Sequence, residues 1–261
     1  MYRAFNVKLD GFDWQQFSKH YNYNYNCLNL RCRDDLRKLI NSSHEISANK
    51  IKQLITPVSN YDIFISHSHK DINLAKGLAG YLEEYCKVSC FIDSLYWGNI
   101  DELLEEFNKK SLHEDKATGK EYFDHQSTKE VAKHANMILA SALTEMINNS
   151  ECVFFLNTDN SVISGSDVIN KNETSSPWIY HEIFITSIIY RRETRRYALF
   201  KGQQIECNLI KRLPRFIYSL DLTGMTNLND NDILNWGSKL NSNNAHPLDV
   251  LYKLKPEQNR N

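Results

Sequence analysis

Short apolar runs and amphipathic stretches alternate along the middle of the chain. The run YDIFIS, residues 61–66, is aromatic and β-branched, which is typical of a strand. A polar loop follows, and Asp71 is placed to cap the amphipathic stretch 72–86, whose spacing predicts a helix. A second strand, KVSCFID, is predicted at 87–93. Strand, loop, helix and strand in this order predict a βαβ unit with two parallel strands and a right-handed crossover.

The alternation continues toward the end of the chain. The predicted elements are an amphipathic piece at 100–110, a long helix at 127–150, a strand at 151–158 (ECVFFLNT), a helix from Ser176, strands at 197–200 (YALF) and 215–222 (RFIYSLDL), and a short helix at 248–254. The polar segment 111–126 is expected to be irregular. Strands that alternate with helices predict an α/β fold with an open, doubly wound sheet.

The two ends of the chain differ from this middle part. Residues 1–60 are polar and rich in Asn and Tyr, with one helical stretch at 30–40. Residues 222–261 carry no further motif apart from the short helix. The sequence therefore predicts an N-terminal helical extension, a central domain at 61–221 and a C-terminal helical tail.

Composition narrows the class of protein. The chain has 261 residues, with 31 Lys and Arg against 32 Asp and Glu, so the formal net charge is −1. This balance argues against a dedicated nucleic-acid binder, which normally has a surplus of basic residues. The six cysteines form no CxxC pair and are typical of reduced, structural residues. No apolar run is long enough to span a membrane and no signal peptide is recognisable, so a cytoplasmic protein without membrane contact is expected.

Candidate ligand-binding residues follow the predicted strands, because open α/β sheets bind ligands at the carboxyl ends of their strands. These residues are Ser66, His67, Ser68, His69, Lys70 and Asp71 after the first strand, Asp93, Ser94, Tyr96, Trp97 and Gly98 after the second, and Asn157, Thr158 and Asp159 after the strand at 151–158. Hydroxyls, aromatic rings, a lysine and carboxylates suit a nucleotide, but polar loops are also ordinary in this class of fold.

The helix that starts with Ser176 and Pro177 carries a further pair of candidates. Ser176 is a good cap and Pro177 suits the first helical position. Trp178 and Glu182 are one turn apart and face the same way. The structural interpretation places the tryptophan in the core and the carboxylate on a solvated edge, because carboxylates are seldom buried. The functional interpretation makes both residues part of a site.

Several common enzyme motifs do not occur. Neither GxxxxGK[ST] nor GxGxxG follows a strand, which disfavours a P-loop ATPase or a Rossmann dehydrogenase. No GxSxG elbow and no HExxH spacing are present. His67 and His69 could hold a metal only with a third ligand that the sequence does not show, so no metal site is predicted.

Four blocks of the chain resemble Toll/interleukin-1 receptor (TIR) domains in the order that the family has. YDIFISHSHKD resembles the opening strand and loop, FIDSLYWGN the second strand and loop, ECVFFLNT the central strand, and SSPWIYHEI the S-x-W-x-x-x-E element. The resemblance covers roughly residues 61–221 and implies a flavodoxin-like parallel sheet of five strands. One departure is Ile179, where many members have cysteine after the tryptophan.

The resemblance implies an enzyme that consumes NAD+, as in bacterial TIR proteins of Thoeris-type anti-phage systems. Matched onto this chain, Glu182 is the catalytic residue and Trp178 its partner in the WxxxE element. Ser66, His67, Ser68 and Lys70 would line the nucleotide site, Tyr96 or Trp97 would stack on a ring, and Asn157 and Asp93 would reach the ribose or the phosphates. NAD+ is then the substrate, with no further cofactor, and the product an ADP-ribose species that signals to a downstream effector.

Two other functions are consistent with the sequence. One is a TIR interaction module without activity, which works by assembling with other TIR domains. The other is a domain that senses NAD derivatives without turnover. Glu182 within WxxxE favours the enzyme, because a pure adaptor has no chemical use for it. Catalytic TIR domains also associate, so the resemblance implies a homo-oligomer in either case.

Overall fold

A computed structural model describes residues 2–21, 34–35, 38–39, 47–56, 60–97, 112–115, 120–123, 125–164, 172–189, 218–240 and 245–257. The chain divides into two compact units. The first comprises residues 1–22, 60–92 and 147–261, and the second comprises residues 23–59 and 93–146.

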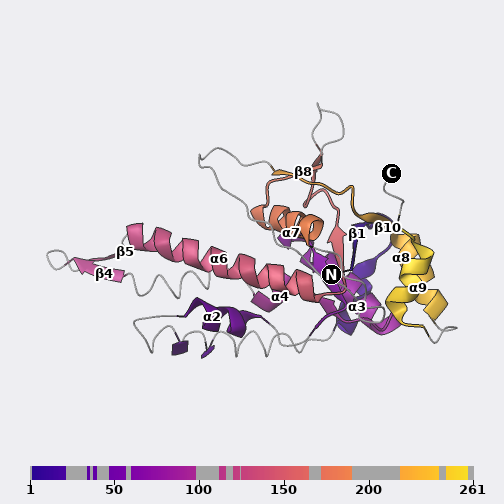
Figure 1. Ribbon diagram of the computed structural model, residues 1–261, viewed down its shortest axis with the longest axis horizontal. Helices are drawn as coiled ribbons and strands as arrows, with labels where there is room; N and C mark the ends of the chain where they lie inside the picture. Colours follow the sequence, from indigo (N-terminus) through magenta and orange to yellow (C-terminus); the bar gives the residue numbers. More distant parts are fainter. Residues whose placement is uncertain are drawn as a thin grey trace. The chain divides into compact units, whose positions relative to one another are not determined.

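The first unit is built on a sheet of five parallel strands (Figure 1). Their order across the sheet is β10 (Thr226–Asn229), β1 (Arg3–Lys8), β6 (Cys152–Leu156), β2 (Ile63–Ser66) and β3 (Cys90–Phe91). The prediction of an α/β fold with a parallel sheet is confirmed. A five-stranded parallel sheet is compatible with a flavodoxin-like fold.

The predicted βαβ unit is confirmed. Strand β2 leads through the short 3-10 helix η2 (His69–Asp71) into α3 (Ile72–Tyr85), and α3 returns the chain to β3, the parallel neighbour of β2. Strand β6, on the other side of β2, is followed by α7 (Pro177–Ile188) and then by β10 at the far edge. The connection from β2 runs toward one edge of the sheet and the connection from β6 runs toward the other edge. A topological switch point therefore lies between β2 and β6.

Two strands of the sheet come from segments that the sequence analysis placed outside the domain. Residues 3–8 form β1, which pairs with β6 on one side and with β10 on the other. The prediction that 1–60 and 222–261 merely flank the sheet is therefore wrong for β1 and β10. Both strands carry polar side chains, RAFNVK and TNLN, so neither shows the apolar run by which a central strand is usually found.

The two strands predicted near the end of the domain do not join this sheet. Of the segment 215–222, Tyr218–Ser219 forms β9, which belongs to a separate antiparallel sheet with β8 (Asn172–Thr174) and β7 (Ile163–Ser164). The predicted strand at 197–200 lies outside the described residues. A short apolar run thus indicates an extended segment but not the sheet to which it belongs.

Each face of the large sheet has its own helices. On one face, Phe154 contacts Phe5 of β1 and Trp236, with ring centroids 5.3 and 6.5 Å apart. Trp236 belongs to α8 (Asp230–Leu240), which lies beside α9 (Pro247–Leu254), both in yellow in Figure 1. On the other face, Phe155 packs with Ile179 and Ile183 of α7. Helix α9 confirms the prediction for 248–254, whereas α8 was not predicted.

The segment after β1 lies tightly against α3. It forms the 3-10 helix η1 (Trp14–His20), and its backbone approaches two glycines of α3. A Cβ atom at Gly77 would lie 2.2 Å from the carbonyl oxygen of Trp14, and one at Gly80 would lie 2.1 Å from that of Phe17. Only glycine permits this approach, so α3 is shaped to receive the N-terminal segment.

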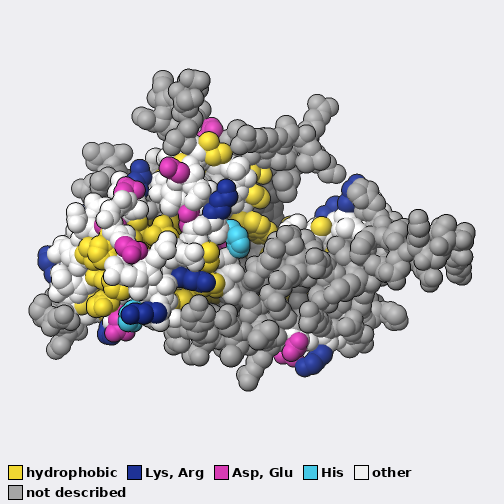
Figure 2. Space-filling model, turned by 180° about the vertical axis from the view of Figure 1, so that it is seen from behind, with side chains coloured by type: hydrophobic (Ala, Val, Ile, Leu, Met, Phe, Trp, Pro, Cys, Tyr) yellow, Lys and Arg dark blue, Asp and Glu magenta, His cyan; other side chains and the backbone are white. Residues whose placement is uncertain are grey.

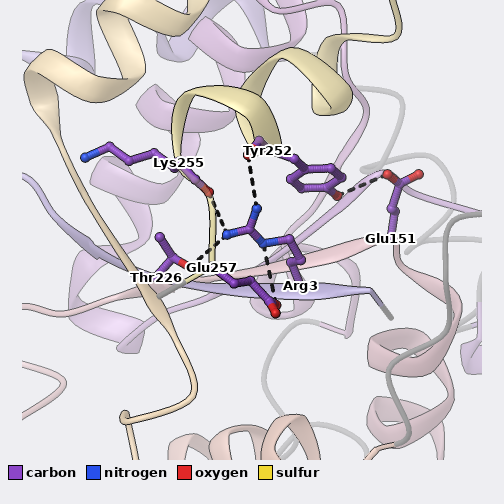
Figure 3. Close-up of polar contacts among 6 residues, drawn as sticks. All are labelled: Arg3, Glu151, Thr226, Tyr252, Lys255 and Glu257. Carbon is purple, nitrogen blue, oxygen red and sulfur yellow. Dashed lines mark hydrogen bonds and ion pairs between the residues drawn. The ribbon is translucent and has the colours of Figure 1, made fainter. Parts of the chain in front are cut away.

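A buried arginine joins β1 to the C-terminal segment (Figure 3). Arg3 is 3% exposed and donates to the carbonyl oxygens of Tyr252 and Lys255, at 3.4 and 2.6 Å, and to Thr226 Oγ1 at 2.9 Å. Its guanidinium also lies over the Tyr252 ring, 5.2 Å from the centroid, and 3.8 Å from Glu257 Oε1. These contacts tie the two ends of the described chain to the amino ends of the strands.

The second unit contains the remaining described elements. They are α2 (Ala48–Ile55), α4 (Asp93–Trp97), the antiparallel pair β4 (Leu112–Asp115) and β5 (Lys120–Phe123), and α6 (His125–Asn149), whose last three residues belong to the first unit. Helix α6 confirms the long helix predicted at 127–150. The pair β4–β5 corrects the expectation of an irregular segment at 111–126. Within the predicted helix at 30–40, residues 34–35 and 38–39 are described and helical, and the piece at 100–110 lies outside the described residues.

Candidate functional site

Helix α7 begins as its sequence predicts. Ser176 is the N-cap and its hydroxyl accepts a hydrogen bond from the backbone N–H of Ile179 at 3.3 Å. Pro177 occupies the first helical position, where its missing N–H has no helical partner to lose. The helix then packs Ile179 and Ile183 against Phe155 of the sheet. This packing fixes the rotation of α7 about its axis and so decides where Glu182 points.

Glu182 is buried against the end of β2. Its side chain is 2% exposed, and the hydroxyl of Ser66, the last residue of β2, donates a hydrogen bond to Glu182 Oε2. Ser66 itself is 0% exposed. The interpretation of Glu182 as a carboxylate on a solvated edge is wrong. Trp178, expected in the core on that interpretation, is partly exposed one turn earlier.

The location of this pair matters as much as its burial. Ser66 ends β2, and β2 and β6 are the neighbours between which the chain reverses direction. Ligands of open α/β sheets bind at such a point, outside the carboxyl ends of the strands. A buried carboxylate is unusual, because removing it from water without compensating hydrogen bonds destabilises the fold. Ser66 and Glu182 are therefore the strongest pair of candidates in the first unit.

The loop after β2 continues the site. His67 is 6% exposed, and its Nδ1 lies 3.2 Å from the carbonyl oxygen of Ile65. A carbonyl oxygen only accepts, so Nδ1 carries the proton of this hydrogen bond. Ser68 is partly exposed, and Lys70 is exposed. The structure thus places Ser66 and His67 inside the protein and leaves Lys70 where a phosphate could reach it.

The sequence position of Asp71 predicted that its side chain would cap α3, and this prediction is wrong. Asp71 is the N-cap residue by position, but its carboxylate makes no capping hydrogen bond. Thr158 Oγ1 and Asn160 Nδ2 donate to it instead, each at 2.6 Å. Asp71 is 9% exposed, so these two bonds replace the water that it gives up. Because they join the loop after β2 to the loop after β6, Asp71 fixes both sides of the switch point.

Asn157 lies at the end of β6, as predicted, and it has hydrogen-bond partners that the sequence did not indicate. Its Nδ2 donates to Asn6 Oδ1 at 2.9 Å, and Asn6 Nδ2 donates to Asn227 Oδ1 at 2.9 Å. Asn6 is in β1 and Asn227 is in β10, so three amides form a continuous row across three neighbouring strands. Sequence reasoning missed Asn6 and Asn227 because their strands were not recognised; a polar residue inside an alternating segment was the only signal.

The candidates from the second strand belong to the other unit. Asp93, Ser94, Tyr96 and Trp97 all lie in α4, which is part of the second unit. Gly98 lies outside the described residues. The expectation that Asp93, Tyr96 and Trp97 line the same site as Glu182 remains a prediction.

The described residues hold neither a metal-ligating cluster nor a membrane-spanning helix. No group of three or more His, Cys, Asp or Glu in that part of the chain could hold a metal ion. Nor is any described helix long and apolar enough to cross a membrane. On the face shown in Figure 2, basic and acidic side chains are interspersed over the described surface, in keeping with the net charge of −1.

Comparison with known proteins gives no match: neither a protein-family model, nor a curated protein, nor a solved structure corresponds to this chain.

Proposed function

We propose that the chain is an enzyme that cleaves the bond between nicotinamide and ribose in NAD+. The observation that carries the proposal is the buried Glu182 carboxylate, held by the Ser66 hydroxyl at the switch point of a parallel sheet. The four TIR-like blocks support it, since they place the WxxxE glutamate at the same position. The TIR fold itself and the flavodoxin-like assignment are part of this proposal.

Cleavage of the bond between nicotinamide and ribose requires one negative charge beside the reacting ribose. When the C1′–N bond breaks, its electron pair leaves with nicotinamide, which becomes neutral, and positive charge develops on the ribose. A carboxylate fixed next to that ribose stabilises the developing charge and can accept hydrogen bonds from the ribose hydroxyls. Ser66 contributes by fixing Oε2, so that the carboxylate needs no reorganisation during the reaction.

The second half of the reaction adds a nucleophile to C1′. Water gives ADP-ribose and releases one proton, whereas a hydroxyl or amine of another group gives a cyclic or conjugated ADP-ribose. His67 follows Ser66 in sequence and is buried, with its ring bonded to the carbonyl oxygen of Ile65 in β2. In this proposal the product is a signalling molecule for anti-phage defence, made in the cytoplasm by a homo-oligomer and read by an effector.

The test is direct measurement of NAD+ turnover by the purified full chain. The parent protein, Glu182→Gln and the control Glu173→Gln are incubated with NAD+, and products are identified by mass spectrometry. We expect nicotinamide release by the parent and by the control, and at least about a hundredfold slower release by Glu182→Gln, as for loss of a preorganised charge. Glu173 lies in β8, so its substitution tests for a general effect of removing a carboxylate.

The alternative outcome has an equally clear meaning. If NAD+ stays intact with the parent protein at concentrations where the chain self-associates, the enzyme proposal is wrong. A non-catalytic interaction module, or a sensor that binds NAD derivatives without turnover, would then account for the sequence. Binding of NAD+ without cleavage, measured by calorimetry, separates these two.

A further inference from the structure

The row of amides on β6, β1 and β10 lies on the same face of the sheet as Glu182. Ser66 and Asn6 are both in register with Phe155, from opposite sides, and Asn6 is in register with Asn227. Side chains in register on neighbouring strands point to the same face. Phe155 contacts α7, which carries Glu182, so the four strands present one line of side chains on the face of the sheet to which α7 belongs.

This line has two polar parts with an apolar residue between them. Ser66, bonded to Glu182, is at one end, Phe155 follows, and the amides of Asn6 and Asn227 are at the other end. With strands about 4.8 Å apart, Asn6 lies roughly 10 Å and Asn227 roughly 14 Å from Ser66 across the sheet. The polar groups therefore extend well beyond the space that one ribose beside Glu182 would occupy.

The burial of the three amides differs in a way that assigns them roles. Asn6 is 8% exposed, Asn157 is partly exposed, and Asn227 is exposed. Asn6 bonds to both others, accepting from Asn157 Nδ2 and donating to Asn227 Oδ1. Asn157 Oδ1 and Asn227 Nδ2 have no partner among the described residues. The buried amide thus orients two accessible ones, which present an acceptor and a donor.

We infer that Asn6 is a positioning residue for the half of the substrate that does not react. Through Asn6, Asn157 and Asn227 present hydrogen-bonding groups to the adenosine diphosphate half, while Glu182 acts on the nicotinamide ribose. Paired acceptors and donors suit ribose hydroxyls and adenine edges, each of which needs both. The inference rests on the proposed function. It implies that the enzyme is specific for a dinucleotide and that the N-terminal strand β1 supplies this specificity.

Substitutions at Asn6 separate orientation from shape. In Asn6→Asp the residue still accepts from Asn157 Nδ2, so Asn157 stays oriented, whereas Asn227 keeps a bond only by turning its amide to donate and then presents an acceptor in place of a donor. In Asn6→Leu both bonds are lost at similar volume. We expect Asn6→Leu to raise KM for NAD+ about tenfold with kcat nearly unchanged, and Asn6→Asp to raise it less, as for loss of uniform binding.

The substrate itself supplies a second comparison. Nicotinamide mononucleotide has the reacting ribose but lacks the adenosine half. We expect Asn6→Leu to leave kcat/KM for this shorter substrate within about twofold of the parent value, because nothing in it reaches the amide row. An equal loss for both substrates would overturn the inference, since it would mean that Asn6 supports Glu182 or the fold in general.

Binding of ADP-ribose tests the inference independently of catalysis. Calorimetry is done in the Glu182→Gln background, with Asn227→Ala as an exposed variant that leaves the buried amide in place and Asn231→Ala in α8 as its matched control. We expect ADP-ribose to bind, Asn6→Leu to weaken binding about tenfold, Asn227→Ala about threefold, and Asn231→Ala not at all.

The outcomes of the two proposals are distinguishable. Weaker ADP-ribose binding in the Asn6 and Asn227 variants of a chain that cleaves no NAD+ supports the amide site and rejects the enzyme. NAD+ cleavage with unchanged KM and unchanged ADP-ribose affinity in both variants supports the enzyme and overturns the amide site. Failure of ADP-ribose to bind the Glu182→Gln protein at millimolar concentration also overturns it.

Discussion

The two ends of the sheet each bury a charged side chain, and the surroundings of these charges differ. At the amino ends of the strands, Arg3 is 3% exposed and is bonded to two carbonyl oxygens and a hydroxyl of its own chain. At the carboxyl ends, Glu182 is 2% exposed and accepts from the Ser66 hydroxyl of a neighbouring strand. Burial alone therefore does not distinguish a structural charge from a catalytic one.

The hydrogen-bond partners of Arg3 and of Glu182 have different effects on the structure. The partners of Arg3 come from β10 and from the end of α9, so each bond holds a segment of the chain in place (Figure 3). The bond to Glu182 orients a carboxylate at the edge where parallel sheets bind ligands. A buried charge at the amino end should therefore matter for stability, and one at the carboxyl end for activity.

The largest expected effect is on stability, at the amino end. Arg3→Met leaves the carbonyl oxygens of Tyr252 and Lys255 without their donor, and we expect the free energy of unfolding to fall by about 3 kcal/mol, as for a broken buried charge network. Urea denaturation measures it, with Glu257→Gln as a control that removes the exposed partner and costs less than about 0.5 kcal/mol. NAD+ cleavage per folded molecule should not change; a large loss of activity would contradict a purely structural role for Arg3.

The amino end also makes the protein sensitive to alkaline pH. Burial raises the pKa of Cys152 well above its ordinary value of 9.0 and raises that of Tyr252 above 10.0. Below pH 9 both groups are protonated in the folded and the unfolded chain. Above these ordinary values only the unfolded chain releases the protons, so each group lowers the free energy of unfolding by about 1.4 kcal/mol per pH unit.

Unfolding in urea at several pH values between 8 and 11 measures this slope. Above pH 10 the free energy of unfolding of Tyr252→Phe should decline less steeply with pH than that of the parent protein. The difference in slope is the contribution of one titrating group, because phenylalanine has no proton to release. Glu182→Gln, at the other end of the sheet, should leave the slope unchanged. A Tyr252→Phe protein with the parent slope would contradict the assignment.

A smaller effect is expected at Ser66. Ser66→Ala removes the hydroxyl that orients Glu182, and we expect kcat for NAD+ cleavage to fall about tenfold, equivalent to one hydrogen bond in the transition state. The control is Ser187→Ala, because the Ser187 hydroxyl bonds to the Phe184 carbonyl oxygen on the exposed side of the same helix α7. An unchanged kcat for Ser66→Ala would show that α7 alone positions the carboxylate.

The smallest effect is expected at Asp71. Asp71→Asn keeps one side-chain acceptor of the two, so the loops after β2 and β6 lose half of their connection. We expect KM to rise about threefold, and backbone amides at 157–161 to exchange hydrogen faster than in the parent protein. Asp159→Asn, an exposed change in the same loop, serves as the control. Equal exchange rates in all three proteins would reject a joining role for Asp71.

The local structure of this protein follows from short stretches of its sequence. The apolar runs at 61–66 and 151–158 became β2 and β6, and the helix between β2 and β3 was recognisable from its spacing. Ser176 and Pro177 fixed the start of α7, because capping and a restricted proline φ act within a few residues. The order of these elements was enough to predict a parallel α/β fold and to select Ser66, Asn157 and Glu182 as candidates.

Which strands complete the sheet, and what the candidate residues contact, depends on segments that are distant in sequence. Asn6 and Asn227 are 221 residues apart in sequence and share a hydrogen bond. Polar side chains inside β1 and β10 have favourable positions only because partners from distant segments satisfy them, so their pattern alone resembles a loop. Glu182 is buried for the same reason: Ser66, 116 residues away, provides the bond that makes burial tolerable.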